Sequence, residues 1–264
     1  MKLEQSGDDP VLYDTIDEHI ALVTLNRPEK RNAVNAAMAQ GLDAAVKRAE
    51  ANPAIRVAIL TSSSAQVFCA GADLSEVAAG RAAGLSTADG GFGGFVYHPR
   101  RKPWIAAARG NVLAGGMELC LACDLIIAAE DCAFGLPEVK RGFVAGAGGL
   151  ARLTRKIPEA IALEMICSGE PVGAQRAYAV GLVNRIVPAA VVLESALQLA
   201  RCIAGNAPLA VQEALQIMRD ANAGADADGR ARASAAIDRL RQTEDFREGP
   251  RAFLEKRAPI WRGR

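Results

Sequence analysis

The stretch WIAAARGNVLAGGMELCLACDLIIAAE, residues 104–130, decides the fold class. Its first seven residues are an apolar run that predicts a strand, and Gly115 and Gly116 then open a helical segment of about ten residues. A second strand-like run, CDLIIAAE, begins at Cys123. Strand–helix–strand units of this kind build parallel sheets, so the stretch predicts an α/β protein.

The flanking sequence repeats this alternation. Residues 11–28 read as a β-hairpin, residues 35–52 as a helix that begins after Asn35, and residues 55–63 as a short buried strand. Another strand is expected within 132–138. The sequence therefore predicts two to three strand–helix–strand units before its C-terminal part.

From Pro158 onward the pattern is mainly helical, interrupted by the strand-like LVNRIV at 182–187 and followed by three helical stretches. Strand signals end near Asn206–Pro208, which predicts a core of residues 1–205 and a C-terminal helical region of residues 206–264. Residues 80–98 are rich in small residues and lack periodicity, so they are expected to form a variable segment over a site or a plain surface loop.

Composition narrows the function classes. Half of the residues are hydrophobic, and 31 Lys and Arg nearly balance 30 Asp and Glu, so no overall charge indicates a nucleic-acid or membrane partner. The first ten residues lack the apolar region of a signal peptide, and no apolar run approaches the roughly 18 residues of a membrane span. We expect a cytoplasmic protein. The basic clusters RPEKR at 27–31 and HPRRK at 98–102 are either solvated surface or contacts for a ligand phosphate.

Cys120 and Cys123 form a CxxC spacing, which occurs in redox pairs and in zinc sites. No second CxxC is present and the chain has two histidines, so a zinc site lacks its other ligands. The favoured interpretation is two small core residues, and no metal is expected.

Two turns of small residues follow strand-like runs and precede helical ones. Ala70–Gly71–Ala72 precedes Asp73, and Ala114–Gly115–Gly116 precedes Glu118. Small residues let a ligand approach the backbone, and N–H groups at the start of a helix bind anions or oxyanions. An ordinary tight turn with Asp73 as the helix N-cap explains the first turn equally well.

Glu118 stands among apolar residues, where an ionised carboxylate is costly by several kcal/mol unless it is paired or faces water. It is either a plain first-turn carboxylate near the helix N-terminus or a group with a tuned pKa. Glu138, after Pro137, is twenty residues away, which excludes one helix but allows adjacent units of one sheet. Two carboxylates that face one pocket can divide acid and base roles.

The glycine-dense segment GFVAGAGGLARL at 142–153 does not match the dinucleotide-binding GxGxxG pattern and does not follow the expected strand. Close backbone packing around a pocket is the favoured interpretation.

In this order, LNRPEKRNAVN, FCAGADLSE, the run from Lys102 to Gly149 and the closing FLEKRAPIW resemble the enoyl-CoA hydratase/isomerase family, the crotonase superfamily. The resemblance covers almost the whole chain. It implies a crotonase-like spiral of ββα units, a C-terminal helical region that forms trimers or hexamers, an acyl-CoA thioester ligand and no separate cofactor.

By this resemblance, the N–H groups of Ala72 and Gly115 form an oxyanion hole, Glu118 activates the water that adds at C3, and Glu138 delivers the proton to C2. A methyl at Ala114, where many members have glycine, is expected to change packing only. The resemblance also implies the following contacts with CoA: Arg27, Lys30, Arg31, Ala33, Ala70, Ala72, Asp73, Leu74, Gly115 and, toward the adenine of its own or a neighbouring subunit, Lys256.

The leading hypothesis is an enoyl-CoA hydratase that adds water to a trans-2-enoyl-CoA, because members that only isomerise, hydrolyse or decarboxylate often lack one of the two glutamates. Alternatives are a dehydratase or isomerase of a special acyl-CoA such as carnitinyl-CoA, and a non-catalytic CoA-binding or scaffold protein. A serine hydrolase is disfavoured because neither His19 nor His98 accompanies a candidate nucleophilic serine.

Overall fold

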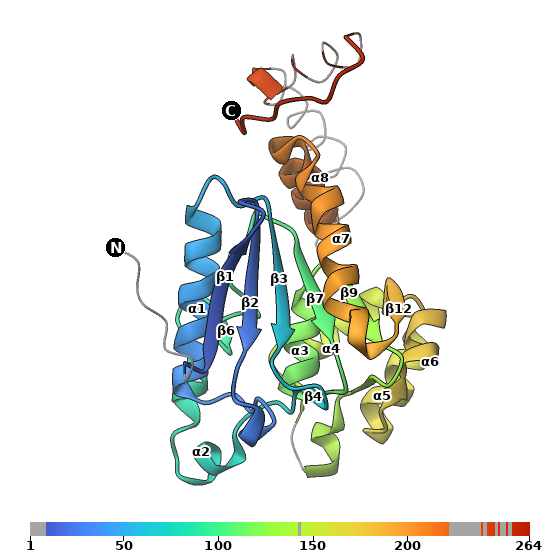
Figure 1. The fold of residues 1–264 in the computed structure, drawn as a ribbon. Coiled ribbons are helices and arrows are strands. Elements are labelled where there is room, and N and C mark those ends of the chain that lie inside the picture. Colours follow the sequence, from blue (N-terminus) through green and yellow to red (C-terminus); the bar gives the residue numbers. More distant parts are fainter. Residues whose placement is uncertain are drawn as a thin grey trace.

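The computed structural model describes residues 9–141, 144–221, 239, 242–245, 248, 252 and 255–264. Its main sheet has six strands, which in spatial order are β1 (Val11–Ile16), β2 (Ile20–Leu25), β3 (Val57–Ser62), β7 (Trp104–Ala108), β9 (Leu125–Ala129) and β12 (Arg185–Val187) (Figure 1). The first two strands pair antiparallel as the predicted hairpin, and all other neighbours pair in parallel. The α/β class is confirmed.

A second sheet of four strands explains how the units repeat. Its spatial order is β11 (Val172–Gly173), β10 (Ala133–Gly135), β8 (Asn111–Leu113) and β4 (Val67–Cys69). Successive strands of the main sheet each lead into one strand of this second sheet and then into a helix: β3–β4–α2, β7–β8–α3 and β9–β10–η3. This succession of ββα units is the predicted spiral.

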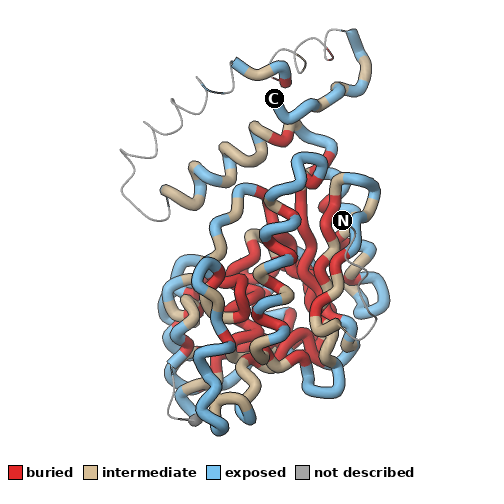
Figure 2. The backbone as a smooth tube through the Cα atoms, turned by 90° about the vertical axis from the view of Figure 1, so that its left-hand side faces the viewer, coloured by how far each residue is buried: buried red, intermediate tan, exposed pale blue. Residues whose placement is uncertain are grey.

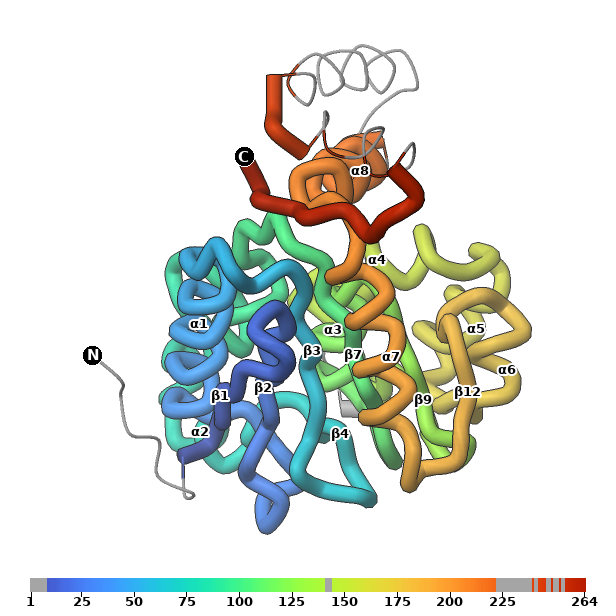
Figure 3. The backbone as a smooth tube through the Cα atoms, turned by 45° about the horizontal axis from the view of Figure 1, so that its top comes forward, coloured from blue at the N-terminus to red at the C-terminus, as the bar shows by residue number. Residues whose placement is uncertain are grey.

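The helices cover the two sheets. Helix α7 contacts β3, β7 and β9 on one face of the main sheet, while α3 and α4 lie on the other side (Figures 1 and 3). The helices and short strands are η1 (Pro28–Lys30), α1 (Ala36–Ala51), α2 (Leu74–Ala78), η2 (Ala82–Leu85), β5 (Ser86–Thr87), β6 (Gly91–Phe92), α3 (Gly115–Ala122), η3 (Pro137–Arg141), α4 (Gly149–Lys156), α5 (Glu159–Ser168), α6 (Ala174–Ala179), η4 (Ala189–Val191), α7 (Val192–Ala204) and α8 (Pro208–Ala221).

Local sequence signals predicted some element boundaries and missed others. Helix α1 begins where Asn35 predicts, because its side-chain oxygen accepts a hydrogen bond from the Met38 N–H at 2.9 Å. The expected strand at 132–138 is shorter, since Pro137 begins η3. Helix α4 was missed, because its glycine-rich start hid the helical pattern of residues 149–156.

The segment 80–98 is more ordered than a plain surface loop. It contains η2 and the two-stranded sheet β5–β6, and the Phe95 side chain is fully buried. The Phe95 ring meets the Trp104 ring edge to face, with centroids 5.0 Å apart. This contact anchors the segment to β7.

The core and the C-terminal region differ in burial. Buried residues gather in the sheets and in α3, whereas α8 lies at the surface and buries Pro208 alone among its residues (Figure 2). The expected helices at α7 and α8 are present, and the third expected stretch falls largely outside the described residues. The boundary at residues 205 and 206 stays a prediction. Within the described ranges, no helix is long and apolar enough to span a membrane.

Candidate active site

A cavity of about 560 Å³ opens where the second sheet meets the helix starts. Turns after β4 and β8, helix α2, the start of η3 and Phe92 of β6 contribute to its lining. Eight residues predicted from the sequence line it: Arg31, Ala33, Ala70, Ala72, Leu74, Gly115, Glu118 and Glu138.

The two small-residue turns meet inside this cavity. A Cβ added at Gly116 would lie 2.1 Å from the Cys69 carbonyl oxygen, and one added at Gly71 would lie 2.9 Å from the Gly115 nitrogen. Gly71 also has a φ of +94°, a conformation that favours glycine. Glycine is therefore required at these positions for the backbones of the two turns to touch.

The backbone leaves an N–H group available in each turn. The bridge between Val34 and Ala72 uses the Val34 N–H, which donates to Gly71, and the Asp73 N–H, which donates to Val34, so it does not use the Ala72 N–H. Gly115 is the first residue of α3, and an N–H there has no acceptor within the helix. Both residues line the cavity, as an oxyanion hole requires.

Glu118 is buried, with 4% of its surface exposed, which excludes a plain solvent-facing carboxylate. Its Oε1 accepts a hydrogen bond from the Gly149 N–H at 2.9 Å. Burial is the main cause that raises the pKa of Glu118 to about 7, the Gly149 hydrogen bond opposes it, and the charge of Glu138 adds to it. A carboxyl with this pKa exchanges a proton readily near neutral pH.

Glu138 reaches the same cavity from the next ββα unit. It lies in η3, directly after Pro137 and two residues beyond the end of β10. Glu138 and Glu118 both line this cavity, and the charge of Glu138 contributes to the raised pKa of Glu118. The structure therefore brings together the two glutamates that stand twenty residues apart in the sequence.

Arg27 and Asp73 are outside the cavity lining and hold its walls. The Arg27 guanidinium donates to the Ala33 carbonyl at 2.5 Å and to the Asp73 carboxylate at 3.4 Å. Asp73 caps α2 by accepting from the Ser75 N–H at 3.1 Å. Hydrogen bonds from Ser75, and then the Arg27 guanidinium, hold the pKa of Asp73 below its usual value. The structure therefore places Arg27 and Asp73 against each other beside the cavity, and neither residue is part of its lining.

The two predicted lysines lie at different places. Lys30 is exposed at the end of η1, next to Arg31 of the cavity. Lys256 is exposed in the C-terminal segment, which is at the opposite end of the molecule from α2 and β4 (Figures 1 and 3). Within one chain, therefore, Lys256 does not reach the cavity.

The backbone conformation of Ala114 shows that the expectation of a packing change only was wrong. Its φ is +52° and its ψ is −130°, so an L residue occupies a backbone conformation that suits glycine. The turn before α3 requires this conformation whichever residue stands there. The substitution therefore strains the backbone at the rim of the cavity.

Sequence reasoning missed one contributor to this site, the Gly149 N–H at the start of α4, which donates to Glu118. Phe92 lines the cavity from segment 80–98, in agreement with the expectation of a segment over a site. The glycine-dense segment packs closely against the pocket as expected, since a Cβ on Gly149 would lie 2.9 Å from the Glu118 side chain.

Cys120 and Cys123 are both buried and free. Burial raises the pKa of both thiols, that of Cys123 to about 12, which disfavours the reactive thiolate. Among the described residues, no group of His, Cys, Asp and Glu is arranged to hold a metal ion.

Known proteins of one family match this chain over almost its whole length. The family model for enoyl-CoA hydratase/isomerase matches residues 15–264. The chain is 40% identical over 247 residues to 2,3-dehydroadipyl-CoA hydratase of Escherichia coli (strain K12), covering 94% of this chain and 96% of that protein. It is 39% identical over 258 residues to carnitinyl-CoA dehydratase of Proteus mirabilis (strain HI4320), covering 96% and 98%.

Solved structures show the same architecture. An enoyl-CoA hydratase from Mycobacterium tuberculosis H37Rv has a TM-score of 0.92 at 42% identity, covering 97% of this chain and 100% of that one. A carnitinyl-CoA hydratase from Mycobacterium avium has a TM-score of 0.76 at 39% identity, covering 97% and 99%.

Proposed function

The chain belongs to the enoyl-CoA hydratase/isomerase family, and from this membership we propose that it adds water across the C2=C3 bond of a trans-2-enoyl-CoA to give a 3-hydroxyacyl-CoA. The observation that carries the proposal is the shared cavity of Glu118 and Glu138 beside the two helix-start turns. A relative named as a hydratase and relatives named as dehydratases support the reaction in one or the other direction.

The thioester oxygen binds between the N–H groups of Ala72 and Gly115. Negative charge grows on this oxygen as water adds at C3 and the enolate forms. Two fixed N–H donors stabilise that charge without reorganising, and one such donor can contribute about 3 kcal/mol to the transition state. This contribution depends on the close contact of the two turns.

The two glutamates divide the proton transfers. Ionised Glu118 removes a proton from the attacking water, and Glu138, in its protonated form, delivers its proton to C2 on the same face, which gives syn addition. The pKa of about 7 for Glu118 suits this task, because the group is ionised in part at neutral pH and remains a useful base. Dehydration uses the same groups in reverse.

Coenzyme A enters as part of the substrate, and no separate cofactor is part of the proposal. Arg31 at the cavity and the neighbouring Lys30 supply positive charge for its phosphates, and Ala33, Ala70 and Leu74 line its path. Arg27 and Asp73 contribute by holding this path in shape.

The proposed assembly is a cytoplasmic homotrimer or homohexamer formed through residues 206–264. Lys256 then reaches the adenine of a neighbouring subunit, since the C-terminal segment lies at the end of the molecule away from α2 and β4 (Figure 1). Helix α8 buries only Pro208 among its residues within one chain, and its exposed surface supports this assembly.

The second candidate function is dehydration or isomerisation of a special acyl-CoA such as carnitinyl-CoA. The relatives named carnitinyl-CoA dehydratase favour it. In that case the two glutamates and the oxyanion hole keep their roles, and the difference lies in the acyl group that the cavity accepts.

A turnover assay over a panel of acyl-CoA thioesters tests the proposal. Crotonyl-CoA, longer enoyl-CoAs and carnitinyl-CoA are supplied, and the absorbance of the conjugated thioester is followed. Glu118→Gln and Glu138→Gln should each lose several orders of magnitude in kcat, a loss typical of catalytic residues, with substrate binding largely kept. Glu159→Gln, at an exposed glutamate in α5, is the matched control and should keep activity.

The outcomes separate the hypotheses. Hydration of crotonyl-CoA supports the hydratase, whereas exclusive turnover of carnitinyl-CoA favours the second candidate. CoA binding with no turnover of any thioester favours the non-catalytic scaffold. Near-normal turnover in either glutamine variant would refute the role assigned to that glutamate.

A further inference from the structure

A second cavity, of about 500 Å³, lies at the other end of α3 from the candidate active site, and we call it the distal cavity. Residues 96–100 before β7, the end of α3, the C-terminal half of α4 and the end of α8 enclose it. It shares no lining residue with the catalytic cavity. Its volume is in the range of small-molecule sites, about 300–1,000 Å³.

The lining of the distal cavity is strongly basic. Five cationic side chains face one carboxylate, that of Asp124. This carboxylate accepts hydrogen bonds from the Arg219 guanidinium at 2.7 and 2.9 Å and from the backbone N–H of Trp104 at 2.8 Å. The remaining cations are Arg100, Arg152, Arg155 and Lys156. Asp124 is therefore already engaged, and the cavity keeps a net positive charge.

Part of this charge serves the C-terminus of α3. The Arg100 Nη2 donates to the Ala122 carbonyl at 2.7 Å, and the Lys156 Nζ donates to the Cys123 carbonyl at 3.2 Å. These contacts offset the partial negative charge of the helix end. Arg155 takes no part in these contacts, so capping of α3 does not explain its place at the cavity.

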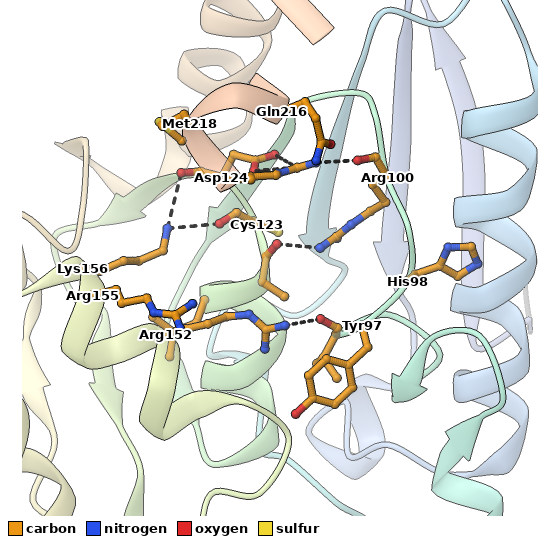
Figure 4. Close-up of a pocket in the computed structure, with 14 residues that line it drawn as sticks. Tyr97, His98, Arg100, Cys123, Asp124, Arg152, Arg155, Lys156, Gln216 and Met218 are labelled. Atoms are coloured by element: carbon orange, nitrogen blue, oxygen red, sulfur yellow. Dashed lines mark hydrogen bonds and ion pairs between the residues drawn. The ribbon is translucent and has the colours of Figure 1, made fainter. Parts of the chain in front are cut away.

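Two groups keep unused donors. The Nε and Nη1 of Arg100 are buried without a hydrogen-bond partner within the described part of the chain, and the guanidinium stacks 4.2 Å from the centre of the Phe95 ring. Arg155 is exposed and makes no hydrogen bond or ion pair with any described residue. Figure 4 shows Arg155 and Lys156 on one side of the cavity and Arg100 on the other. Guanidinium groups so placed bind phosphate and carboxylate groups well.

We propose that the distal cavity binds a small multivalent anion, held by Arg100, Arg155 and Lys156. Phosphate and carboxylate groups share the chemistry that these donors recognise. The proposal is independent of the proposed function, because it uses none of the residues of the catalytic cavity.

Isothermal titration of the full-length protein at low salt tests it, with pyrophosphate and citrate as the probes. Saturable binding is expected, and Arg155→Gln should weaken it about tenfold, the usual effect of losing one charge-assisted hydrogen bond. Arg155 is exposed, so this variant should fold, and circular dichroism checks that it does. Lys156→Gln should weaken binding as well.

Two controls locate the binding. Arg185→Gln removes an exposed arginine of β12 outside the cavity, and Arg31→Gln removes the cation of the catalytic cavity. Both should leave the distal affinity unchanged. Tighter binding of pyrophosphate identifies phosphate as the preferred group, and tighter binding of citrate identifies carboxylate. Absence of binding, equal weakening in Arg185→Gln, or weakening in Arg31→Gln alone would each overturn the proposal.

Discussion

Replacing Glu118 by Gln is expected to stabilise the protein at and above neutral pH. The Glu118 carboxyl has a pKa of about 7 in the folded protein, against an ordinary value of 4.5. At about 1.4 kcal/mol for each tenfold change, ionised Glu118 costs the folded state about 3 kcal/mol. The side chain is 4% exposed, so solvent screens little of this cost.

The pH dependence of this cost has a definite sign. Below about pH 4.5, Glu118 is protonated in the folded and the unfolded chain, and no cost arises. Between about pH 4.5 and 7 the unfolded chain has released the proton while the folded chain keeps it, so the free energy of unfolding falls as pH rises. Above about pH 7 the folded chain is ionised too, and the cost is constant.

Glutamine keeps an oxygen that accepts from the Gly149 N–H and cannot ionise. The difference in unfolding free energy between Glu118→Gln and the wild type should therefore grow by about 3 kcal/mol from about pH 4 to 8. Urea unfolding at constant protein concentration measures it. Any fixed effect of the added amide shifts all values equally and leaves the slope intact.

The exposed Glu159 provides the matched control, since Glu159→Gln should show a small and nearly constant difference. A difference for Glu118→Gln that is independent of pH, or that shrinks as pH rises, would refute the reasoning. It would mean that burial does not oppose ionisation of Glu118, whatever its role in catalysis.

Three further predictions concern the cavity. If Glu118 is the base, kcat/KM should fall about tenfold per pH unit below about pH 7 and level off above it, and a flat steady-state profile would contradict this. Ala114→Gly should raise the unfolding free energy by about 1 kcal/mol. The strain energy released at a φ of +52° is larger than the free-energy cost of the entropy that glycine adds to the unfolded chain. Urea unfolding measures the change, and destabilisation would exclude the strain. Gly116→Ala places a Cβ 2.1 Å from the Cys69 carbonyl oxygen and must separate the two turns, so kcat should fall by about 10²-fold or more. The control variant Gly173→Ala, whose Cβ would have nothing within 4 Å, should keep activity. Equal activity in the two variants would argue against the oxyanion hole.

Some features could be predicted because they depend on neighbours in the sequence. The hairpin followed from two β-branched runs around an acidic turn, and α1 from helical spacing after Asn35. The family resemblance added the spiral and the pairing of Glu118 with Glu138. Helix α4 was missed because its signal begins in a run of glycines, where local propensity predicts no helix.

The sequence by itself determined which residues can form turns, helices and strands, since periodicity and small-residue spacing act over a few residues. Tertiary structure alone decided that the turns at Gly71 and Gly115 touch, that Ala114 is strained, and that Phe95 is buried. It also set the pKa of Glu118 and gathered the cations of the distal cavity. Burial and electrostatic fields arise from groups that are distant in the chain, and only the folded arrangement brings those groups together.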